Sequence, residues 1–181
     1  MSLALVHSRA LDGLNAPEVT VEVHLANGLP SFTLVGLADT EVKEARERVR
    51  AALATSGLDF PHNKRITVNL APADLPKESG RFDLPIALGI LAAAGQIDAA
   101  RLAGHEFAGE LSLAGELRPV RGALAMALAL QRQPASAERQ RERAAHRPQF
   151  AGQRQLAGEL AARQLRGIEQ AVGGQDAERD R

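Results

Sequence analysis

Residues 65–94 read RITVNLAPADLPKESGRFDLPIALGILAAA and hold two elements of different periodicity. In residues 65–70 apolar and polar side chains alternate, which predicts a half-buried strand. From Leu84 to Ala94 nearly every residue is apolar, and Pro85 stands in the first turn, where a helix tolerates proline. A helix that is apolar on all sides is expected to be buried on all sides. The stretch therefore predicts a strand followed by a buried helix.

A polar loop, residues 77–83, joins this strand to this helix. Its side chains offer a base, two acids, a hydroxyl and a second cation; they are Lys77, Glu78, Ser79, Arg81 and Asp83. Loops held between rigid elements often carry function, so these five residues form a candidate interaction loop. In the structural alternative Lys77, Glu78 and Arg81 face solvent, Gly80 provides a turn with positive φ, and Asp83 is only the helix N-cap. The sequence leaves both interpretations open.

Upstream of this stretch the pattern predicts three strands, at residues 3–6, 19–25 and 32–36. Turn residues separate them, so we expect an opening meander in which consecutive strands pair. Residues 39–57 then predict a helix, because Asp39 suits the N-cap, Gly57 suits the C-terminal stop, and apolar residues recur at three- and four-residue steps. The charged residues of this helix, Arg48 among them, are expected to form a solvated face.

Downstream, residues 106–113 and 115–117 predict a short hairpin, and residues 122–131 predict a third helix. This order of elements indicates an α+β fold or an α/β sandwich, with helices packed on one sheet. The composition changes near residue 133, and residues 134–181 are rich in Arg, Gln, Ala and Glu without any Lys. We therefore expect a domain at residues 1–133 and a tail at residues 134–181, disordered at 134–153.

Composition argues against several classes of function. The 22 Lys and Arg residues balance the 22 Asp and Glu residues, so bulk charge does not favour nucleic acid or anionic membranes. The chain has no Cys, as is common in a reducing cytoplasm. No lysine follows a glycine as a Walker A loop requires, and no pair of histidines has zinc-helix spacing. We expect a cytoplasmic protein without a membrane segment, a metal or a cofactor.

Three segments resemble the N-terminal domain of the YifB/ComM family, the magnesium-chelatase-like AAA+ ATPases linked to competence. They are residues 28–37, 47–52 and 66–89, which read GLPSFTLVGL, ERVRAA and ITVNLAPADLPKESGRFDLPIALG. The resemblance extends from about residue 3 to about residue 131. The family usually has Pro at the position of Ala38, a departure on which the following helix does not depend.

This resemblance implies a fold like that of ribosomal protein S5 domain 2, with helices packed on one mixed sheet, related to the proteolytic domain of Lon. Lon-type peptidases activate a Ser at the start of the buried helix with a Lys on the later helix. In this chain the helix start falls at or next to Asp83, and residues 122–131 contain no Lys. Lys77 is too near Ser79 in sequence to be the usual partner, so we expect no peptidase activity.

In the family, ATP binding belongs to a AAA+ module that follows this domain, and the implied role is DNA processing during natural transformation. The resemblance thus implies a non-catalytic accessory domain, here without the ATPase module. Its implied partners are further copies of itself, a AAA+ ATPase or DNA. The tail does not match the family's continuation. One interpretation is that the tail derives from a frameshift or a gene truncation. The alternative is that it is an appended helix, because apolar residues recur at near-helical spacing, namely Leu156, Leu160, Leu165, Ile168 and Val172.

Two other functions stay open. S5-like folds occur in RNA-binding proteins, so one alternative is a stand-alone nucleic-acid-binding module. Its cationic contacts would have to converge on one face together with Arg81; the candidates are Lys64, Arg65, Arg118 and Arg121. The other alternative is a Ser-Lys peptidase with Ser79 or Ser112 as the nucleophile.

Overall fold

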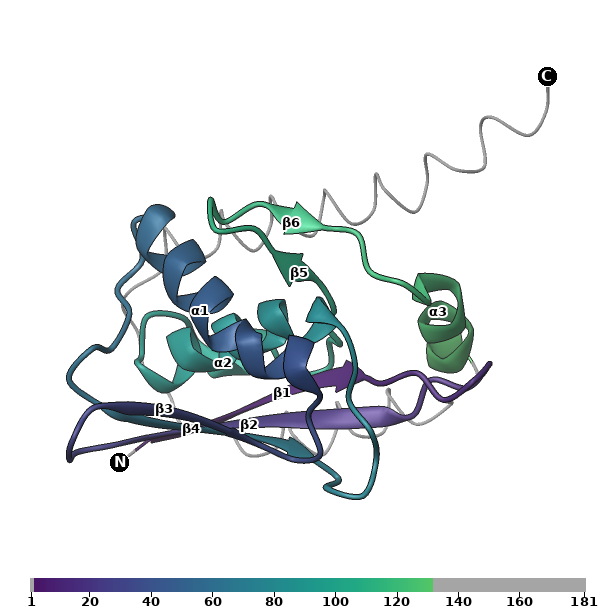
Figure 1. Ribbon diagram of the computed structural model, residues 1–181, viewed down its shortest axis with the longest axis horizontal. Helices are drawn as coiled ribbons and strands as arrows, with labels where there is room; N and C mark the ends of the chain where they lie inside the picture. Colours follow the sequence, from purple (N-terminus) through teal and green to yellow (C-terminus); the bar gives the residue numbers. More distant parts are fainter. Residues whose placement is uncertain (1, 132–181) are drawn as a thin grey trace. The chain divides into compact units, whose positions relative to one another are not determined.

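Four strands form one mixed sheet, seen nearly edge-on in Figure 1: β1 (Ser2–Arg9), β2 (Glu18–Ala26), β3 (Ser31–Val35) and β4 (Arg65–Ala71). The structure is a computed structural model that describes residues 2–131. The strand order is β1-β2-β4-β3. β2 pairs antiparallel with both β1 and β4, whereas β3 runs parallel to β4.

The predicted strands are confirmed, but the predicted meander is wrong at its third strand. β3 pairs with β4 instead of β2, beginning at Ser31 opposite Arg65. Helix α1 (Thr40–Thr55) connects the two strands. Parallel neighbours need a crossover of this kind, because a tight turn can join only antiparallel strands. The sequence pattern identified the strands. Their order in the sheet depends on where α1 brings the chain back to the sheet, which the pattern does not show.

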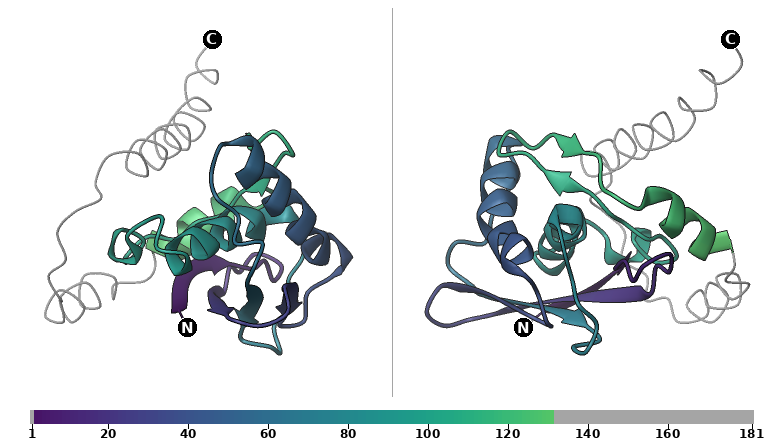
Figure 2. Two further views of the ribbon diagram at one scale, coloured as in Figure 1. Left: turned by 90° about the vertical axis from the view of Figure 1, so that its left-hand side faces the viewer. Right: turned by 45° about the vertical axis from the view of Figure 1, so that its right-hand side comes forward.

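Helices α1 and α2 (Asp83–Ala93) cover one face of the sheet (Figures 1 and 2). Asp39 caps α1 as predicted, with its Oδ1 accepting a hydrogen bond of 2.7 Å from the Val42 amide. α2 is buried over nearly its whole length, as its apolar sequence predicted. Both helices therefore take their positions from residues that the sequence pattern identified.

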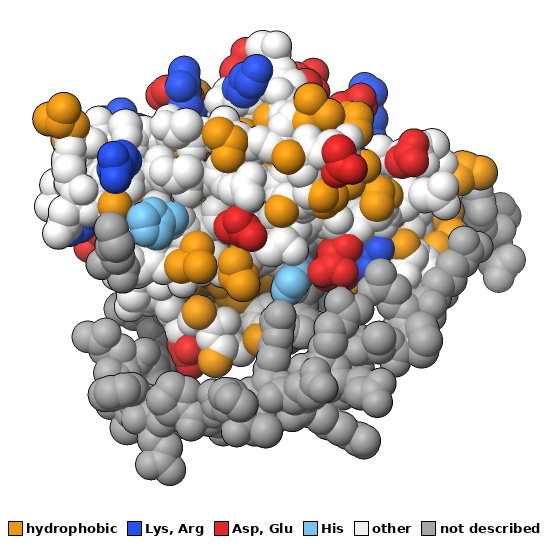
Figure 3. Space-filling view, turned by 90° about the horizontal axis from the view of Figure 1, so that it is seen from below, with side chains coloured by type: hydrophobic (Ala, Val, Ile, Leu, Met, Phe, Trp, Pro, Cys, Tyr) orange, Lys and Arg blue, Asp and Glu red, His pale blue; other side chains and the backbone are white. Residues whose placement is uncertain are grey.

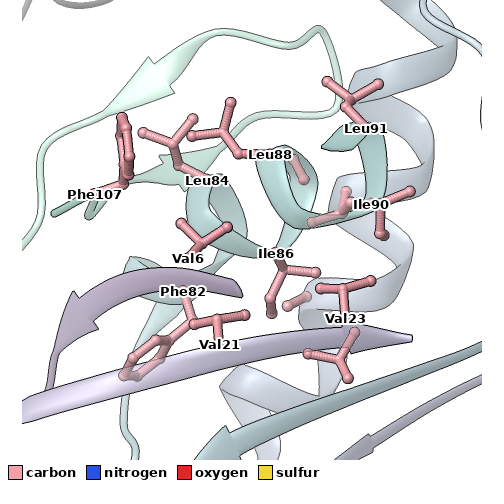
Figure 4. Packing of buried hydrophobic residues seen from close by; sticks show 14 of the residues in the cluster. Val6, Val21, Val23, Phe82, Leu84, Ile86, Leu88, Ile90, Leu91 and Phe107 are labelled. Atoms are coloured by element: carbon pink, nitrogen blue, oxygen red, sulfur yellow. The ribbon is translucent and has the colours of Figure 1, made fainter. Parts of the chain in front are cut away.

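The core lies between α2 and the inward-facing side chains of the sheet. Figure 4 shows Val6, Val21 and Val23 pointing toward Ile86 and Ile90. Gly89 allows the close approach, since a Cβ at this position would lie 2.5 Å from Cγ2 of Val23. Close packing of this kind makes the contact sensitive to a single added methyl group.

A small hairpin and a third helix complete the described chain. The hairpin pairs β5 (Glu110–Leu111) with β6 (Leu117–Arg118), and α3 (Ala123–Gln131) follows it. Both elements were predicted, although the hairpin strands are shorter than the pattern suggested. Two short 3₁₀ turns, Gly80–Phe82 and Ala99–Arg101, flank α2. Residues 2–131 therefore form an α+β fold, with three helices, a four-stranded mixed sheet and a small hairpin.

Within residues 2–131, none of the helices has the length and apolarity needed to cross a bilayer. The expected domain boundary at residue 133 and both interpretations of the tail at 134–181 lie outside the described residues.

The face of the sheet opposite α1 and α2 carries a mixture of side chains. Figure 3 shows acidic, histidine and hydrophobic groups interspersed on it. Glu22 and Asn69 are cross-strand neighbours there, and the Asn69 amide donates to the Glu22 carboxylate at 2.9 Å. Leu3 and Leu5 of β1 are exposed on the same face. We call this surface the open face.

Candidate functional site

The 77–83 loop is anchored at its first residue to the beginning of α1. The Lys77 amide donates to the Leu37 carbonyl at 3.1 Å, and the Asp39 amide donates to the Lys77 carbonyl at 3.1 Å. The Lys77 side chain is buried, and its Nζ donates to the Pro72 carbonyl. The structural alternative placed Lys77 in solvent and is wrong here, because this backbone clamp draws the residue inward. Burial lowers the pKa of the Lys77 ammonium, and Asp74 partly opposes this.

In the middle of the loop the structural alternative is wrong about Gly80 and about Arg81. Positive φ occurs at Ser79, at 65°, and not at Gly80. Glycine is needed at position 80 for space, since a Cβ there would lie 2.6 Å from Cγ of Glu110. Arg81 is also buried instead of solvated, and its Nε donates to the Ser79 hydroxyl at 3.1 Å and to the Glu78 carbonyl at 3.2 Å. Glu78 is exposed, as the structural alternative expected.

The loop ends at a buried ion pair. The Asp83 carboxylate is fully buried and accepts from Nε of Arg48 at 2.7 Å and from Nη2 at 3.0 Å. Its Oδ2 also accepts from the Leu111 amide at 3.1 Å. Asp83 is the first residue of α2 and not its N-cap, which is Phe82, so the structural alternative is wrong for Asp83. The prediction that Arg48 belongs to a solvated face is also wrong. The ion pair is bidentate, and its two hydrogen bonds fix the relative orientation of the two side chains as well as their distance.

Burial and pairing act in opposite directions on the two partners of this ion pair. The hydrogen bond to Asp83 raises the pKa of the Arg48 guanidinium, in spite of partial burial. Burial raises the pKa of the Asp83 carboxyl, although the bonds from Arg48 and from the Leu111 amide lower it. The loss of hydration falls mainly on Asp83, because its side chain has no exposed surface whereas that of Arg48 is 19% exposed.

Together these contacts make the 77–83 loop a junction between elements. The Arg81 carbonyl accepts from the Gly109 amide at 2.9 Å, and the Leu84 amide donates to the Gly109 carbonyl at 3.0 Å. The Arg48–Asp83 pair ties α1 to α2, and the Leu111 amide adds β5. The side chains of four of the five predicted loop residues therefore make hydrogen bonds within the described fold, and the exception is Glu78. Glu78 contributes only its backbone carbonyl, which accepts from Arg81.

The two serines considered as nucleophiles have other contacts. The Ser79 hydroxyl accepts from Arg81, while the Lys77 ammonium is engaged by the Pro72 carbonyl. The Ser112 hydroxyl accepts from the Glu116 amide at 3.0 Å within the turn of the β5–β6 hairpin. A nucleophilic serine needs a base within hydrogen-bond reach, and these contacts do not supply one. In the described part of the chain, no cluster of three His, Asp or Glu side chains is placed to hold a metal ion.

The cations considered for nucleic-acid binding lie in separate places. Arg65 stands opposite Ala26 at the final residue of β2, and Lys64 beside it donates to Asn27 at 2.8 Å. Arg121 lies at the other end of the β1–β2 pair. Its neighbour Gly122 packs against Leu11, which follows β1, since a Cβ on Gly122 would lie 2.4 Å from the Leu11 side chain. Figure 2 shows α3 and the start of β4 well separated.

The two remaining cationic candidates are engaged within the fold. Arg118 is paired with Glu110 at 3.1 Å on the hairpin, and Arg81 is buried. The five cations therefore do not form one basic face.

A pocket of about 350 Å³ lies beside Lys64. Its lining combines apolar residues such as Leu25 and Pro61 with polar ones such as Asp59 and Gln96. The latter two are tied together, since Gln96 Nε2 donates to the Asp59 carbonyl at 2.6 Å. The ionisable side chains that line the pocket are Lys64 and Asp59. Because their charges are opposite, they favour neither an anionic nor a cationic ligand.

Sequence reasoning missed two ion pairs. Arg48 lies beside Val49 and one turn before Ala52, at the border of the buried stripe of α1, which is the signal that could have placed it against the core. Arg9 is buried at the end of β1 and pairs with Glu106 at 2.5 Å, at a separation of 97 residues along the chain. No local pattern announces a contact of that separation.

Comparison with known proteins supplies a further finding. Residues 21–138 match a family described as subunit ChlI of Mg-chelatase. The chain is 61% identical over 132 residues to the competence protein ComM of Haemophilus influenzae, a match that covers 73% of this chain and 26% of that protein. It is 60% identical over 127 residues to YifB of Salmonella typhimurium, covering 70% of this chain and 25% of that protein.

A more distant similarity has the same extent. The protein Mb2921c of Mycobacterium bovis is 41% identical over 132 residues, again 73% of this chain and 26% of that protein. The chain thus spans about a quarter of the length of the relatives that it matches.

Proposed function

The chain belongs to the family of subunit ChlI of Mg-chelatase, and on this premise we propose that it is a non-catalytic accessory domain of a ComM-type AAA+ ATPase. One observation carries the proposal: an identity of about 60% to the N-terminal region of ComM and YifB extends over 127–132 residues. That length is nearly the whole described fold. The similarity therefore concerns a complete folded unit and not a short motif.

The finer assignment of the fold is part of the same proposal. We assign the domain to the ribosomal protein S5 domain 2-like class. Support comes from the mixed sheet of order β1-β2-β4-β3 and from the two helices that cover one of its faces. Fold alone does not determine function, so the role rests on the identity to ComM.

The contacts of the 77–83 loop favour a structural role over a catalytic one. Lys77, Arg81 and Asp83 each make hydrogen bonds within the fold, and Asp83 is occupied by Arg48 and by the Leu111 amide. Nη1 of Arg81 is buried without a partner among the described residues. Catalytic groups usually point into a cleft where substrate can reach them. We therefore propose that the domain supports the ATPase through contacts between subunits or with substrate DNA, and that it carries out no chemistry itself.

A domain replacement in ComM tests this function. Residues 1–131 of this chain would replace the matching region of the Haemophilus influenzae protein, and transformation frequency would be measured alongside a deletion of that region. We expect the replacement to retain transformation and the deletion to lose it. A chimera that folds and hydrolyses ATP but leaves transformation at the level of the deletion would contradict the proposal.

The chain itself provides the complementary measurement. The proposed contacts with DNA belong to the assembled ATPase, so we expect the purified chain on its own to bind neither Mg-ATP nor a DNA duplex at 150 mM salt, and to cleave no unfolded protein substrate. Binding of DNA that weakens steeply with salt would favour the nucleic-acid module instead. Labelling of Ser79 or Ser112 by a serine-directed probe would revive the peptidase.

A further inference from the structure

The outer edge of β1 has unpaired backbone groups over its first half. β1 is an edge strand of the four-stranded sheet, with β2 on its inner side. The His7 carbonyl points outward, since it accepts from the Phe107 amide at 2.9 Å. In an antiparallel strand the outward-facing residues alternate, so the amides and carbonyls of Leu5 and Leu3 point outward as well. Within residues 2–131 these groups have no hydrogen-bond partner.

The side chains of this edge lack the usual protection against strand pairing. Natural edge strands carry Lys, Pro or a bulge that prevents another strand from adding. Residues 2–6 read SLALV and contain none of these. Leu3 is 63% exposed and Leu5 is 44% exposed, and both lie on the open face. Addition of a strand would therefore pair backbone groups and bury apolar surface in one step.

The opposite edge of the sheet offers less. On β3 the most exposed side chains are Ser31, Thr33 and Val35, two of which carry hydroxyl groups. Pro30 stands immediately before this strand and has no amide to donate. Of the two edges, β1 therefore has the greater apolar gain on pairing.

We propose that the free edge of β1 pairs antiparallel with β1 of a second copy of this chain, joining two four-stranded sheets across a two-fold axis. The chain segment at Glu106 and Phe107 already occupies the edge at His7, so the free edge ends at Val6. The longest self-pairing of residues 2–6 is centred on Ala4. It places Leu3 of each copy opposite Leu5 of the other.

This register is self-complementary in both backbone and side chains. The outward-facing Leu3 and Leu5 form two hydrogen-bonded pairs, which exchange about four backbone bonds. A two-fold axis perpendicular to the sheet keeps the open faces on the same side, so the four leucines gather into one apolar cluster. No charge in residues 2–6 opposes its own copy across the axis. Because one segment of this chain supplies both sides of the match, a second copy is the favoured occupant.

Disulfide cross-linking tests the register directly, because the chain has no cysteine of its own. The full-length variants Leu3→Cys and Leu5→Cys would be oxidised separately and as an equimolar mixture. In the proposed register the two different cysteines face each other at about 5.5 Å between Cα atoms, within the range that a disulfide spans. Identical cysteines would be diagonal, roughly 7–8 Å apart.

We expect the mixture to give several-fold more covalent dimer than either variant alone. Leu14→Cys, at a loop position that is 95% exposed, reports random collision. A mixture that cross-links no more than Leu14→Cys would overturn the proposal, and so would Leu3→Cys linking to itself as efficiently as the mixture.

Sedimentation equilibrium of the uncrosslinked chain is the second test. A contact of five residues per copy is small, so we expect a reversible dimer whose population rises with concentration. Leu5→Lys should weaken dimerisation at least tenfold, because it brings charges into the leucine cluster, whereas Leu14→Lys should leave it unchanged. A monomer at all concentrations, or an oligomer indifferent to Leu5→Lys, would show that the β1 edge does not carry the contact.

Discussion

Helices α2 and α3 have similar compositions and opposite surroundings. α2 reads DLPIALGILAA and α3 reads ALAMALALQ, so both are apolar nearly all round. In α2 all residues but Ala92 are buried. In α3 Met126 is buried, whereas Leu124, Leu128 and Leu130 are 74%, 42% and 46% exposed. Apolar composition thus predicts that a helix gains from being covered, but it does not say that the same chain covers it.

The difference arises from the surfaces that face each helix. α2 rests on β1 and β2, with Gly89 brought against Val23, and α1 lies beside it (Figure 4). α3 follows the hairpin and approaches the described fold near Leu11, just after β1. A helix over the centre of a sheet is covered by strands from several parts of the chain. A helix at the end of a sheet meets few residues.

The largest effect should come from breaking the ion pair at the first turn of α2. Asp83→Ala leaves the buried side of Arg48 without its carboxylate and the Leu111 amide without its acceptor. Removal of one partner of a buried pair costs about 3–5 kcal/mol. Urea denaturation would measure the loss in the free energy of unfolding.

A double-mutant cycle provides the control for this variant. Arg48→Met combined with Asp83→Ala removes both charges, so we expect the double variant to lose less stability than the sum of the two single variants. Strict additivity would mean that the pair does not couple α1 to α2.

The next effect sharpens the contrast between the two helices by one matched truncation. Ile86→Ala empties a fully buried site against the sheet and should cost about 2–5 kcal/mol. Leu128→Ala removes a half-exposed side chain from α3 and should change stability by less than about 1 kcal/mol. Both losses can be read from the same denaturation series. Equal losses would mean that α3 is covered in solution by something outside the described residues.

The contrast is also instructive about what the sequence predicts. Periodicity identified β1, β2, β4, α1 and α2, because each of these elements contrasts a buried side with an exposed one or is buried throughout. The pairing of β3 with β4 was missed, since strand order depends on how a crossover helix returns the chain. Gly80 was expected to have positive φ, yet its role depends on Glu110, which is distant in sequence.

The 77–83 loop shows the same limit for the candidate site. Its polar residues suggested solvent exposure or function, and both follow from local composition. Lys77, Arg81 and Asp83 are instead buried, because their partners come from residues 72, 78, 79, 48 and 111. The identity of these side chains was visible in the sequence. Their exposure depended on contacts with other elements, for which the sequence offered at most the border position of Arg48 on α1.

A smaller effect reverses the usual ranking of Gly and Ala in helices. In an exposed helix Ala is more stable than Gly by about 1 kcal/mol, so Ala127→Gly on the exposed side of α3 should lose about that amount. In α2, Gly89→Ala should instead destabilise by about 1–3 kcal/mol, because the new Cβ would collide with Val23. Circular dichroism melts of both variants would check the signs. A stabilising Gly89→Ala would show that α2 can move away from the sheet.

The smallest expected effect is a slope with pH, and it also distinguishes the two helices. Burial raises the pKa of the Asp83 carboxyl in the folded chain. A carboxyl of this kind stabilises the fold below its ordinary pKa of about 4, and this contribution is lost as the pH rises through the raised value. As the pH rises between these two pKa values, the free energy of unfolding of the wild type should therefore fall relative to that of Asp83→Asn. The matched α3 variant Leu128→Ala should run parallel to wild type over the same range, because α3 contains no titratable side chain. An opposite slope for Asp83 would mean that the bonds from Arg48 and Leu111 outweigh the loss of hydration.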